Sequence, residues 1–431
     1  MFFFNKEIET MQRNRLVPLQ MKRLRTLLSE LYNKNPFYTK RLRDLGAEPS
    51  DFTTIAALQK FPFTTKQKLL DDQAANPLFG SNLTYPESAY TRFHQTSGTT
   101  GKPLLVPDTA GSWDWWGRCW GTVLAGAGLT ANDRLFVAFG FGPFIGFWAA
   151  VEGARHINAM MVPGGGRDSL QRLHLMRDAG CTALCCTPTY ALRLAEVAVE
   201  SNLDLKSFPI RATIHAGEPG ASVPATKKRI EWVWGAKCYD HAGATEIGAH
   251  SFECLAQPGG IHINEAEFIA EVIDPDAGAP VATGQPGELV LTNLGRFGFP
   301  VIRYRTGDIV KLADEVCDCG RTFVRCEGGI LGRWDDMLTV RGVNIYPSAI
   351  ENVLRAFDEI NEFRVTVARE RHMDVLRIEI ECIENCNRDR VADNVAAEIS
   401  RTLGLRPAIQ AVDRNTLPRF ELKARRFFVK R

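Results

Sequence analysis

The middle of the chain alternates short apolar runs with helix-length amphipathic segments, and this pattern constrains the fold more than any other feature. The apolar runs have the length of buried strands and cover Leu135 to Phe139, Ala159 to Val162, Thr182 to Cys186, Ile210 to Ala216 and Ala236 to Tyr239. Helix-length stretches lie between them at Ser169 to Asp178, Tyr190 to Val199 and Ala225 to Trp234. Strands and helices that alternate at this spacing form parallel sheets through right-handed crossovers. We therefore predict an α/β fold with parallel or mixed sheets flanked by helices.

The regions on either side of this pattern differ from it. Residues 1 to about 75 have a mostly helical pattern, in which Thr64-Thr65-Lys66 begins one short helix. After Pro258-Gly259-Gly260 the chain becomes a succession of strands, such as Glu267 to Ile273 and Glu288 to Thr292, with turns rich in Gly, Pro and Asp. This pattern predicts a β-rich subdomain within a large N-terminal domain.

A separate unit follows near the C-terminus. Helices are predicted at Ser348 to Ala356 and Arg388 to Leu403, and strands at Phe363 to Ala368 and Val375 to Cys382. This alternation is typical of a small α+β sandwich with helices on one face. Because 431 residues exceed one ordinary core, we predict domains at 1–334 and 335–431, joined within Gly332-Arg333-Trp334-Asp335-Asp336.

Charge and apolar patterning exclude several classes of protein. Lys plus Arg (52) and Asp plus Glu (50) nearly cancel, so the formal charge of +2 gives no general attraction for nucleic acid or for an anionic membrane. No apolar run approaches the ~20 residues of a membrane span, and Met1 to Glu7 lacks a signal-peptide pattern. We expect a cytoplasmic protein with mostly buried, reduced cysteines. The oligomeric state stays open, with a homodimer as one alternative.

A loop rich in glycine and hydroxyl residues gives the strongest local signal of function. It reads Thr96-Ser97-Gly98-Thr99-Thr100-Gly101-Lys102-Pro103. Backbone N–H groups and hydroxyls in such a loop can surround phosphate oxygens, and Lys102 adds positive charge. The loop does not fit the strand-to-helix phosphate loop, which has four residues between its glycines and a Ser or Thr after the lysine. Taken alone, a flexible turn is the alternative interpretation.

Further motifs follow in order at strand ends or in loops, where ligands bind to such sheets. They are Gly217-Glu218-Pro219, Tyr239 to Glu246, Ile302 to Asp308, Gly332 to Met337 and Arg341 to Pro347. From about Thr96 to the C-terminus, the ordered set resembles the acyl-adenylate-forming superfamily, and within it the phenylacetate–CoA ligase-like branch of aryl-CoA ligases. The combination of Tyr304 to Asp308, Gly332 to Asp336 and Arg341 to Pro347 is far more specific than any single motif.

The resemblance implies an ATP site. The loop of Thr96, Ser97, Gly98, Thr99, Thr100, Gly101 and Lys102 would fold over the β- and γ-phosphates. The adenine would be walled by Gly217, Glu218, Pro219, Asp240, His241 and Ala242. Thr245 would hold the α-phosphate, and Glu246 would ligate Mg²⁺, a hard cation that prefers carboxylate oxygens. Asp308 would accept hydrogen bonds from the ribose hydroxyls, with Arg333 nearby, and a turn aspartate after Gly307 is the alternative.

The resemblance also implies a reaction in two steps. The substrate carboxylate attacks the α-phosphorus of ATP and pyrophosphate leaves, and the thiol of coenzyme A then expels AMP. Charge builds on the phosphoryl oxygens, so positive groups and Mg²⁺ carry most of the catalysis. In the family the small C-terminal domain moves between the two steps, and Asp335 matches the hinge position.

The C-terminal lysine departs from the family pattern, which ends in a segment shaped like Pro-x-x-x-Gly-Lys. Here Pro418 and Lys423 keep the spacing, but Leu422 stands in the glycine position and Phe420 where a small residue is usual. Glycine permits a close backbone approach that leucine resists. We predict that Lys423 neutralises charge during adenylation. A merely solvated basic tail, Lys423 to Arg426, is the alternative.

Cysteine and histidine residues indicate a metal site. Cys254, His262, Cys317 and Cys319 would supply the four ligands of a tetrahedral Zn²⁺. Cys-x-Cys is less diagnostic than repeated Cys-x₂-Cys, so isolated buried thiols are the alternative, and Cys326 is a rival fourth ligand. Many members of the branch that the chain resembles have a Cys…His…Cys-x-Cys pattern here. The resemblance therefore favours a structural rather than a catalytic zinc.

The segment from Phe139 to Trp148 is rich in aromatics and glycines and follows a predicted strand. Glycines admit a flat ring close to the backbone, and aromatic side chains stack on it. We predict a pocket for an aromatic acid of the phenylacetate, benzoate or anthranilate type, lined by Phe141, Phe144, His94, His215, Ala216 and Gly243. One of the three histidines His94, His215 and His241 would form a hydrogen bond with a substituent on the ring of the acid. Ordinary core packing and structural histidines are the alternatives.

Three classes of function therefore remain open. The first is an ATP-dependent aryl acid–CoA ligase. The second adenylates an aryl acid and passes it to a carrier protein or another nucleophile. The third is a non-catalytic relative that binds nucleotide. The nucleotide motifs are common to the first two classes, so they do not separate them.

Overall fold

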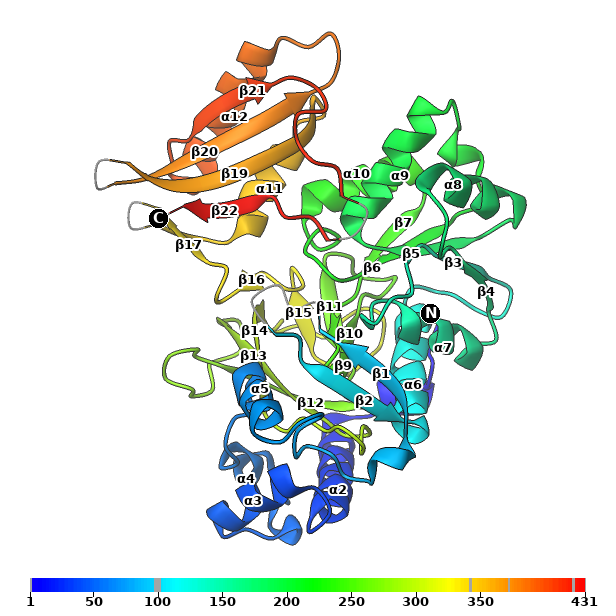
Figure 1. Cartoon of the computed structure of the whole chain (residues 1–431), viewed down its shortest axis with the longest axis vertical. Helices are drawn as coiled ribbons and strands as arrows, with labels where there is room; N and C mark the ends of the chain where they lie inside the picture. Colours follow the sequence, from blue (N-terminus) through cyan, green and yellow to red (C-terminus); the bar gives the residue numbers. More distant parts are fainter. Residues whose placement is uncertain (1, 97–101, 341–342, 371–372, 421–422, 431) are drawn as a thin grey trace.

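The computed structural model describes residues 2–96, 102–340, 343–370, 373–420 and 423–430 (Figure 1). As predicted, the first part of the chain is mainly helical, with α1 (Lys6–Glu9), α2 (Arg13–Leu31), α3 (Pro36–Leu45), α4 (Ile55–Gln59) and α5 (Lys66–Ala75). Thr65 caps α5 by accepting a hydrogen bond from the N–H of Lys68 at 3.2 Å, as its sequence predicted. Short 3₁₀ turns occur at Pro49–Asp51, Glu87–Ala89 and Leu205–Ser207.

The predicted parallel sheet has five strands in the order β4-β3-β5-β6-β7. Its strands are β3 (Arg134–Val137), β4 (Met160–Pro163), β5 (Ala183–Cys186), β6 (Ala212–His215) and β7 (Lys237–Asp240). The flanking helices are α7 (Trp148–His156), α8 (Ser169–Asp178), α9 (Pro188–Glu200) and α10 (Pro224–Trp234). Leu135 and Val137 belong to one apolar core and Phe136 to another, because alternate residues of a strand face opposite sides of the sheet.

A hairpin and a long helix precede this sheet and were not predicted from the sequence. The hairpin pairs β1 (Tyr90–Gln95) with β2 (Leu105–Thr109), and α6 (Ala110–Gly126) follows directly. Trp115 and Trp120 of α6 are fully buried, and α6 packs against α7. A helix that is apolar on most of its surface lacks the one-sided periodicity by which amphipathic helices are recognised.

The β-rich region contains a three-stranded sheet in the order β10-β11-β15 and a four-stranded sheet in the order β12-β13-β14-β16. Their strands are β10 (Ser251–Phe252), β11 (Gly260–Ile263), β12 (Phe268–Ile273), β13 (Pro286–Asn293), β14 (Tyr304–Lys311), β15 (Arg325–Glu327) and β16 (Gly332–Arg333). The short strands β8 (Gly243–Ala244) and β9 (Gly248–Ala249) pair with each other. The predicted β-rich subdomain is thus present.

The C-terminal unit is a four-stranded sheet in the order β21-β20-β19-β22, with helices packed on it (Figure 1, orange and red). It contains β17 (Leu338–Val340), β18 (Val343–Ile345), α11 (Pro347–Arg355), β19 (Ile360–Glu370), β20 (Met373–Cys382), α12 (Arg388–Leu403), β21 (Ala408–Val412) and β22 (Phe427–Lys430). An apolar core of its own includes Ile350, Val365 and Val395. Within the described ranges, no helix is long and apolar enough to cross a membrane.

Candidate active site and metal centre

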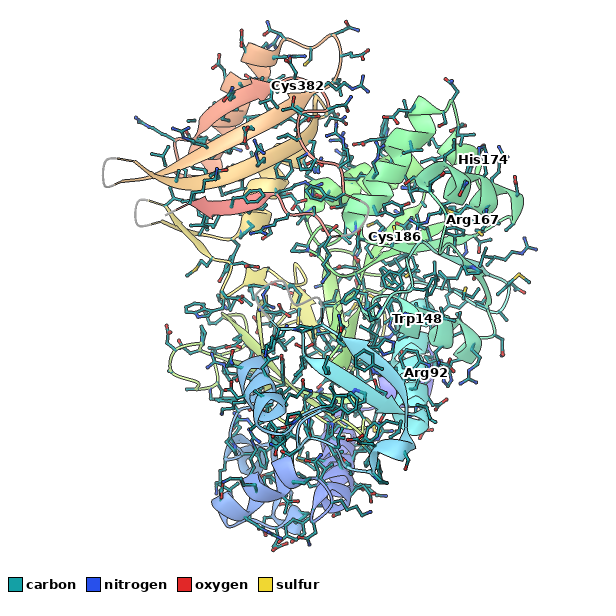
Figure 2. The ribbon with its side chains drawn as sticks, in the orientation of Figure 1. Arg92, Trp148, Arg167, His174, Cys186 and Cys382 are labelled. Carbon is teal, nitrogen blue, oxygen red and sulfur yellow. The ribbon has the colours of Figure 1, made fainter. Side chains whose placement is uncertain are left out.

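The predicted nucleotide motifs meet at the carboxyl edge of the parallel sheet. Strands β5, β6 and β7 end at Cys186, His215 and Asp240, and the chain continues from these ends into Thr187, Ala216 and His241. Figure 2 labels Cys186 at this edge, between the sheet and α9. Neighbouring parallel strands bring their carboxyl ends together, so the motifs after β6 and β7 lie side by side.

Asp240 belongs to a buried network of charges behind this edge. Its backbone N–H donates to Glu253 Oε2 at 2.8 Å, and Lys227 Nζ pairs with the same carboxylate at 2.9 Å. Burial, together with the charge of Glu253, raises the pKa of Asp240 to about 7. Neither Lys227 nor Glu253 lies in one of the sequence motifs, so neither was predicted.

Glu246 and Thr245 are held by residues far away in the sequence. The Tyr304 hydroxyl donates to Glu246 Oε1 at 2.8 Å, which orients a carboxylate suited to Mg²⁺. Arg296 donates to the Thr245 carbonyl at 2.8 Å and forms a fully buried pair with Asp108 at 2.6 Å. This buried pair fixes the backbone at Thr245, although neither Asp108 nor Arg296 was predicted from the sequence.

Asp308 and Arg333 sit opposite each other on β14 and β16. Arg333 lies 3.3 Å from Asp308 Oδ1 and makes two contacts with the Asp335 carboxylate, at 2.9 and 3.0 Å. Burial raises the pKa of Asp308 to about 6, against the opposing effect of Arg333. The predicted ribose acceptor and the predicted hinge residue are therefore linked through one guanidinium.

Lys423, the C-terminal lysine of the motif, lies close to Phe144 and Gly217. Lys423 Nζ lies 5.1 Å from the centre of the Phe144 ring. A Cβ atom on Gly217 would lie 3.3 Å from Lys423 Cε, so glycine leaves room for the lysine side chain. Desolvation by the surrounding protein lowers the pKa of Lys423, opposed by Glu218 and by Glu246, even though solvent still reaches the side chain.

Part of the predicted phosphate loop lies outside the described residues, namely Ser97, Gly98, Thr99, Thr100 and Gly101. At its edges, Thr96 is buried and its Oγ1 accepts from the Leu104 N–H at 3.0 Å, while Lys102 is exposed. The role of the loop stays a prediction. Leu422, which occupies the glycine position of the lysine motif, is also outside the described residues.

The aromatic segment that was predicted to line the acid pocket lies beside β1, which carries His94. Phe141 packs edge-on against Trp148 (labelled in Figure 2), with 4.9 Å between ring centres. Gln95, next to His94 on β1, forms a bridge with Phe144. Phe141 and Phe144 are only partly buried, in contrast to the fully packed core aromatics.

The histidines are neutral and partly unsatisfied. His94 stacks on Trp113 at 5.2 Å, and burial lowers its pKa to about 4. Burial likewise lowers the pKa of His215 to about 3, and its Nδ1 donates to the Cys186 carbonyl at 3.1 Å. Among the described residues, His94 Nδ1 and His215 Nε2 are buried without a hydrogen-bond partner. Such atoms are available to a polar group of a ligand.

The remaining residues predicted near the acid are His241, Ala216 and Gly243. His241 Nδ1 donates to the Ser251 carbonyl at 2.6 Å and packs against Trp120, so this histidine is structurally satisfied on that side. Ala216 is half-buried and Gly243 is exposed. A Cβ atom on Gly243 would lie 2.9 Å from the Gly248 carbonyl, which explains a glycine at this position.

Cys254, His262, Cys317 and Cys319 form one buried cluster, as predicted. Their ligand atoms all lie within 4.8 Å of one another. Cys254 Sγ is 3.5 Å from Cys317 Sγ, and Cys319 Sγ is 3.5 Å from His262 Nε2. Ligands of a tetrahedral zinc with bonds of about 2.0–2.3 Å lie roughly 3.3–3.8 Å apart, so the donor set fits this metal.

The surroundings of the cluster also suit a metal. His262 Nδ1 donates to the Phe323 carbonyl at 3.0 Å, which leaves Nε2 as the ligand atom. The rival ligand Cys326 is buried on β15 opposite Ile261 and is not a member of the four-residue group. The geometry therefore favours the set with His262, Cys254, Cys317 and Cys319.

Comparison with known proteins identifies relatives of the whole chain. The model of the AMP-binding enzyme family matches residues 40–296, and the model of the AMP-binding enzyme C-terminal domain matches residues 342–431. The phenylacetate-coenzyme A ligase of Thermus thermophilus is 35% identical over 384 residues, which cover 88% of this chain and 84% of the relative. The enzyme of that name from Escherichia coli is 33% identical over 432 residues, 98% of this chain and 96% of the relative.

Solved structures show the same fold in different states of one relative. The 2-hydroxyisobutyryl-CoA ligase in its postadenylation state is 30% identical, with a TM-score of 0.94 over 100% of this chain and 92% of that chain. The same ligase in its thioesterification state, 31% identical and covering 99% and 92%, gives a TM-score of 0.75. The arrangement of the present structure is thus close to that of the postadenylation state.

Proposed function

The chain belongs to the AMP-binding enzyme family, and from this premise we propose that it is an AMP-forming acid–thiol ligase for an aromatic carboxylic acid. It activates the acid with ATP and transfers the acyl group to coenzyme A. One observation carries the proposal: Lys423 lies 5.1 Å from Phe144 while Glu218 and Glu246 both act on its charge. A cation, an aromatic wall and the predicted nucleotide residues therefore meet at one place.

In the first step, an oxygen of the substrate carboxylate bonds to the α-phosphorus of ATP, and the bond from that phosphorus to pyrophosphate breaks. Lys423 neutralises the charge on the carboxylate and α-phosphate, and Thr245, held by Arg296, positions the α-phosphate. Glu246 would hold Mg²⁺, which would supply further charge neutralisation. Asp308 accepts from the ribose hydroxyls and thereby fixes the nucleotide.

In the second step, the thiol sulfur of coenzyme A bonds to the acyl carbon, the thiol proton is lost, and AMP leaves. We propose that residues 335–431 move as a domain between the steps, with Asp335 at the hinge. The TM-scores of 0.94 and 0.75 against two states of one relative support a change of arrangement in this family. The two contacts between Arg333 and Asp335 are exposed, so little free energy opposes their rearrangement.

The aromatic specificity rests on the partly buried rings of Phe141 and Phe144. Curated relatives are named as phenylacetate-coenzyme A ligases, whereas the solved relative is named for a small hydroxy acid, so the family name alone leaves the acid undefined. The neutral histidines, His94 and His215, offer unpaired nitrogens to a ring substituent.

We also propose that the four-residue cluster holds a structural Zn²⁺ and that the protein works in the cytoplasm. The absence of disulfides among its cysteines, all of which lie in described residues, is consistent with that compartment.

The test is acid-dependent exchange between ATP and pyrophosphate across a panel of acids, followed by a coenzyme A product assay. Exchange should require Mg²⁺ and should favour flat aromatic acids, with kcat/KM at least about tenfold higher than for hexanoate. Equal kcat/KM for benzoate-type acids and hexanoate would contradict the aromatic pocket. Exchange without a coenzyme A product would instead indicate another acyl acceptor.

A further inference from the structure

The residue after Lys423 is bound directly to the large domain. The Ala424 N–H donates to Glu218 Oε2 at 2.6 Å. The other oxygen of the same carboxylate accepts from the Thr189 N–H at 2.9 Å, in the first turn of α9. Glu218 therefore bridges α9 and the backbone beside the lysine. This contact is additional to the role in walling the adenine that the resemblance implies.

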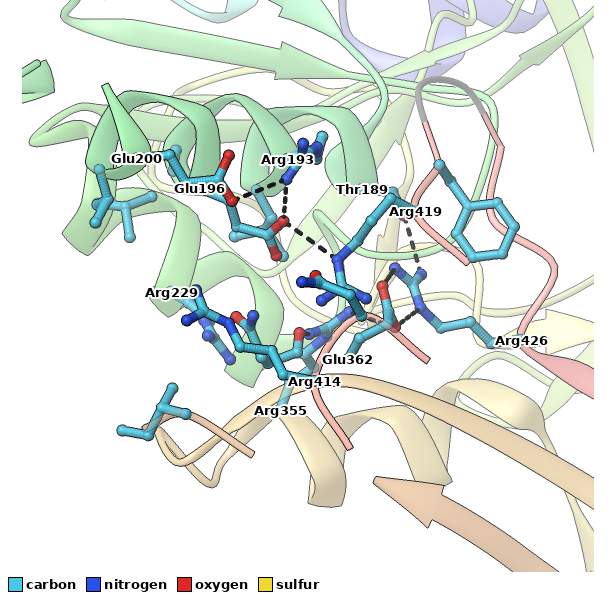
Figure 3. Close-up of a pocket in the computed structure, with 18 of the residues that line it drawn as sticks. Thr189, Arg193, Glu196, Glu200, Arg229, Arg355, Glu362, Arg414, Arg419 and Arg426 are labelled. Carbon is cyan, nitrogen blue, oxygen red and sulfur yellow. Dashed lines mark hydrogen bonds and ion pairs between the residues drawn. The ribbon is translucent and has the colours of Figure 1, made fainter. Parts of the chain in front are cut away.

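A second link lies two residues further along. Arg426 forms a two-pronged pair with Glu362 of β19, at 2.6 and 2.8 Å, and also donates to Thr189 Oγ1 at 3.0 Å (Figure 3). All three side chains are buried. The pair with Glu362 lies within the C-terminal unit, whereas the bond to Thr189 crosses to the large domain.

Other polar links also join the two units near this point, such as the bond from Arg229 to the Ile360 carbonyl at 2.7 Å. A cavity of about 340 Å³ lies between α9, α10 and the C-terminal unit, and Thr189, Glu362 and Arg426 are on its wall (Figure 3). A wall that faces a cavity gains little from close packing, so the contact here depends on polar links. Individual hydrogen bonds contribute modestly and can be broken and remade, as a moving domain requires.

From these contacts we infer that Thr189, Glu218 and Arg426 are positioning residues that form a latch, which holds Lys423 in place for adenylation and opens for thioester formation. The inference rests on the proposed function. A lysine side chain has many conformers, so fixing the backbone that follows it restricts where the ammonium can lie. The fixing contacts come from residues after the lysine, so they do not depend on a glycine before it.

Thr189→Val tests the latch with little risk to folding. It removes the hydroxyl that Arg426 reaches, yet keeps the backbone N–H to Glu218 and the Arg426–Glu362 pair. Exchange of ATP and pyrophosphate should slow about tenfold, as expected when a hydrogen bond to a charged group is lost. The KM for ATP and the rate of thioester formation from supplied acyl-adenylate should stay the same. Thr402→Val, an exposed threonine on α12, is the matched control and should change neither step.

A double variant separates positioning from general damage. If Thr189 acts only through the lysine, Thr189→Val should have no further effect on exchange in a Lys423→Ala background. Equal slowing of both half-reactions, or the same loss in both backgrounds, would overturn the latch and leave the proposed function intact. A parent protein without acid-dependent exchange would overturn the proposed function itself.

Discussion

The cysteine–histidine cluster and the Lys423 segment both join residues that are far apart in the sequence, but they do so in opposite ways. The ligand residues of the cluster, Cys254 to Cys319, are all buried within the β-rich region. Lys423 is exposed, and the segment around it touches two units of the chain through a few hydrogen bonds. The cluster has the form of a fixed structural site, whereas the lysine is placed only while the two units are in one arrangement.

The largest effect should come from breaking the fixed site. Cys317→Ser with Cys319→Ser should lower zinc from about one per chain and reduce the free energy of unfolding by about 4 kcal/mol or more, because metal binding is coupled to folding. Elemental analysis and denaturant unfolding measure the two effects. Cys326→Ser, a buried thiol outside the cluster, should keep the metal. Parent protein purified without chelator that holds no metal would contradict the assignment.

Substitution of Lys423 should impair adenylation only. Lys423→Ala should slow adenylation about a hundredfold or more, since loss of one preorganised charge costs on the order of 2.7–4 kcal/mol. Thioester formation from supplied acyl-adenylate should be largely intact, and so should the stability of the fold. Lys430→Ala, outside the motif, is the control for loss of a basic residue. If both variants exchange at the same rate, Lys423 is ordinary surface.

Glu246, the proposed Mg²⁺ ligand, lies in the large domain, and its substitution should have an intermediate effect. Glu246→Gln keeps an acceptor for the Tyr304 hydroxyl but replaces a charged metal ligand with a neutral one. Exchange should fall about tenfold at fixed Mg²⁺, a cost of about 1.4 kcal/mol, and more Mg²⁺ should be needed for half-maximal rate. Glu384→Gln, an exposed carboxylate, should be silent. An unchanged Mg²⁺ requirement in Glu246→Gln would remove Glu246 from the metal site.

Elements with local signals, in the large domain and in the C-terminal unit alike, were those that the sequence predicted best. The bounds of α8 and α12 agree with the predicted Ser169 to Asp178 and Arg388 to Leu403, because hydrophobic periodicity and capping residues are local signals. The strand predicted from Leu135 to Phe139 ends at Val137, since Ala138 and Phe139 are apolar for reasons of packing in the loop. The four residues of the Cys/His cluster were predicted because their types are chemically specific and because the family resemblance favoured a metal site there.

Contacts between distant residues had no local signal. The partner of Thr245 is Arg296, itself paired with Asp108, and nothing in the neighbourhood of any of the three indicates the others. The bond from Arg426 to Thr189 likewise depends on how two units of the chain are placed relative to each other. Sequence motifs identify which residues have a role, but the three-dimensional structure is needed to show what holds them.

The last expected effect is a pH dependence of stability, which is small for each pH unit. It concerns Asp240, whose backbone N–H donates to Glu253, the residue before Cys254. The folded chain raises the pKa of Asp240 from 3.8 to about 7, chiefly by burial. Between about pH 4 and pH 7 the folded state therefore keeps a proton that the unfolded chain releases. The stability that this group contributes is fully present below about pH 4 and is lost as the pH rises toward 7, by at most about 1.4 kcal/mol per pH unit.

Asp240→Asn cannot titrate, so its stability should lack this decline, and the parent should lose stability relative to the variant as the pH is raised. Urea unfolding without ligands, at several values between about pH 5 and pH 7, measures the difference. Asp276→Asn, an exposed aspartate, serves as the control and should follow the parent. The same dependence of stability on pH should appear in Lys423→Ala, because the contact between Asp240 and Glu253 does not depend on where the C-terminal unit lies. A constant difference between parent and Asp240→Asn at every pH would mean that Asp240 is ionised in the folded protein. If the dependence of stability on pH disappears in Lys423→Ala, the surroundings of Asp240 are coupled to the position of Lys423. The Lys423 segment would then not be independent of the fixed region.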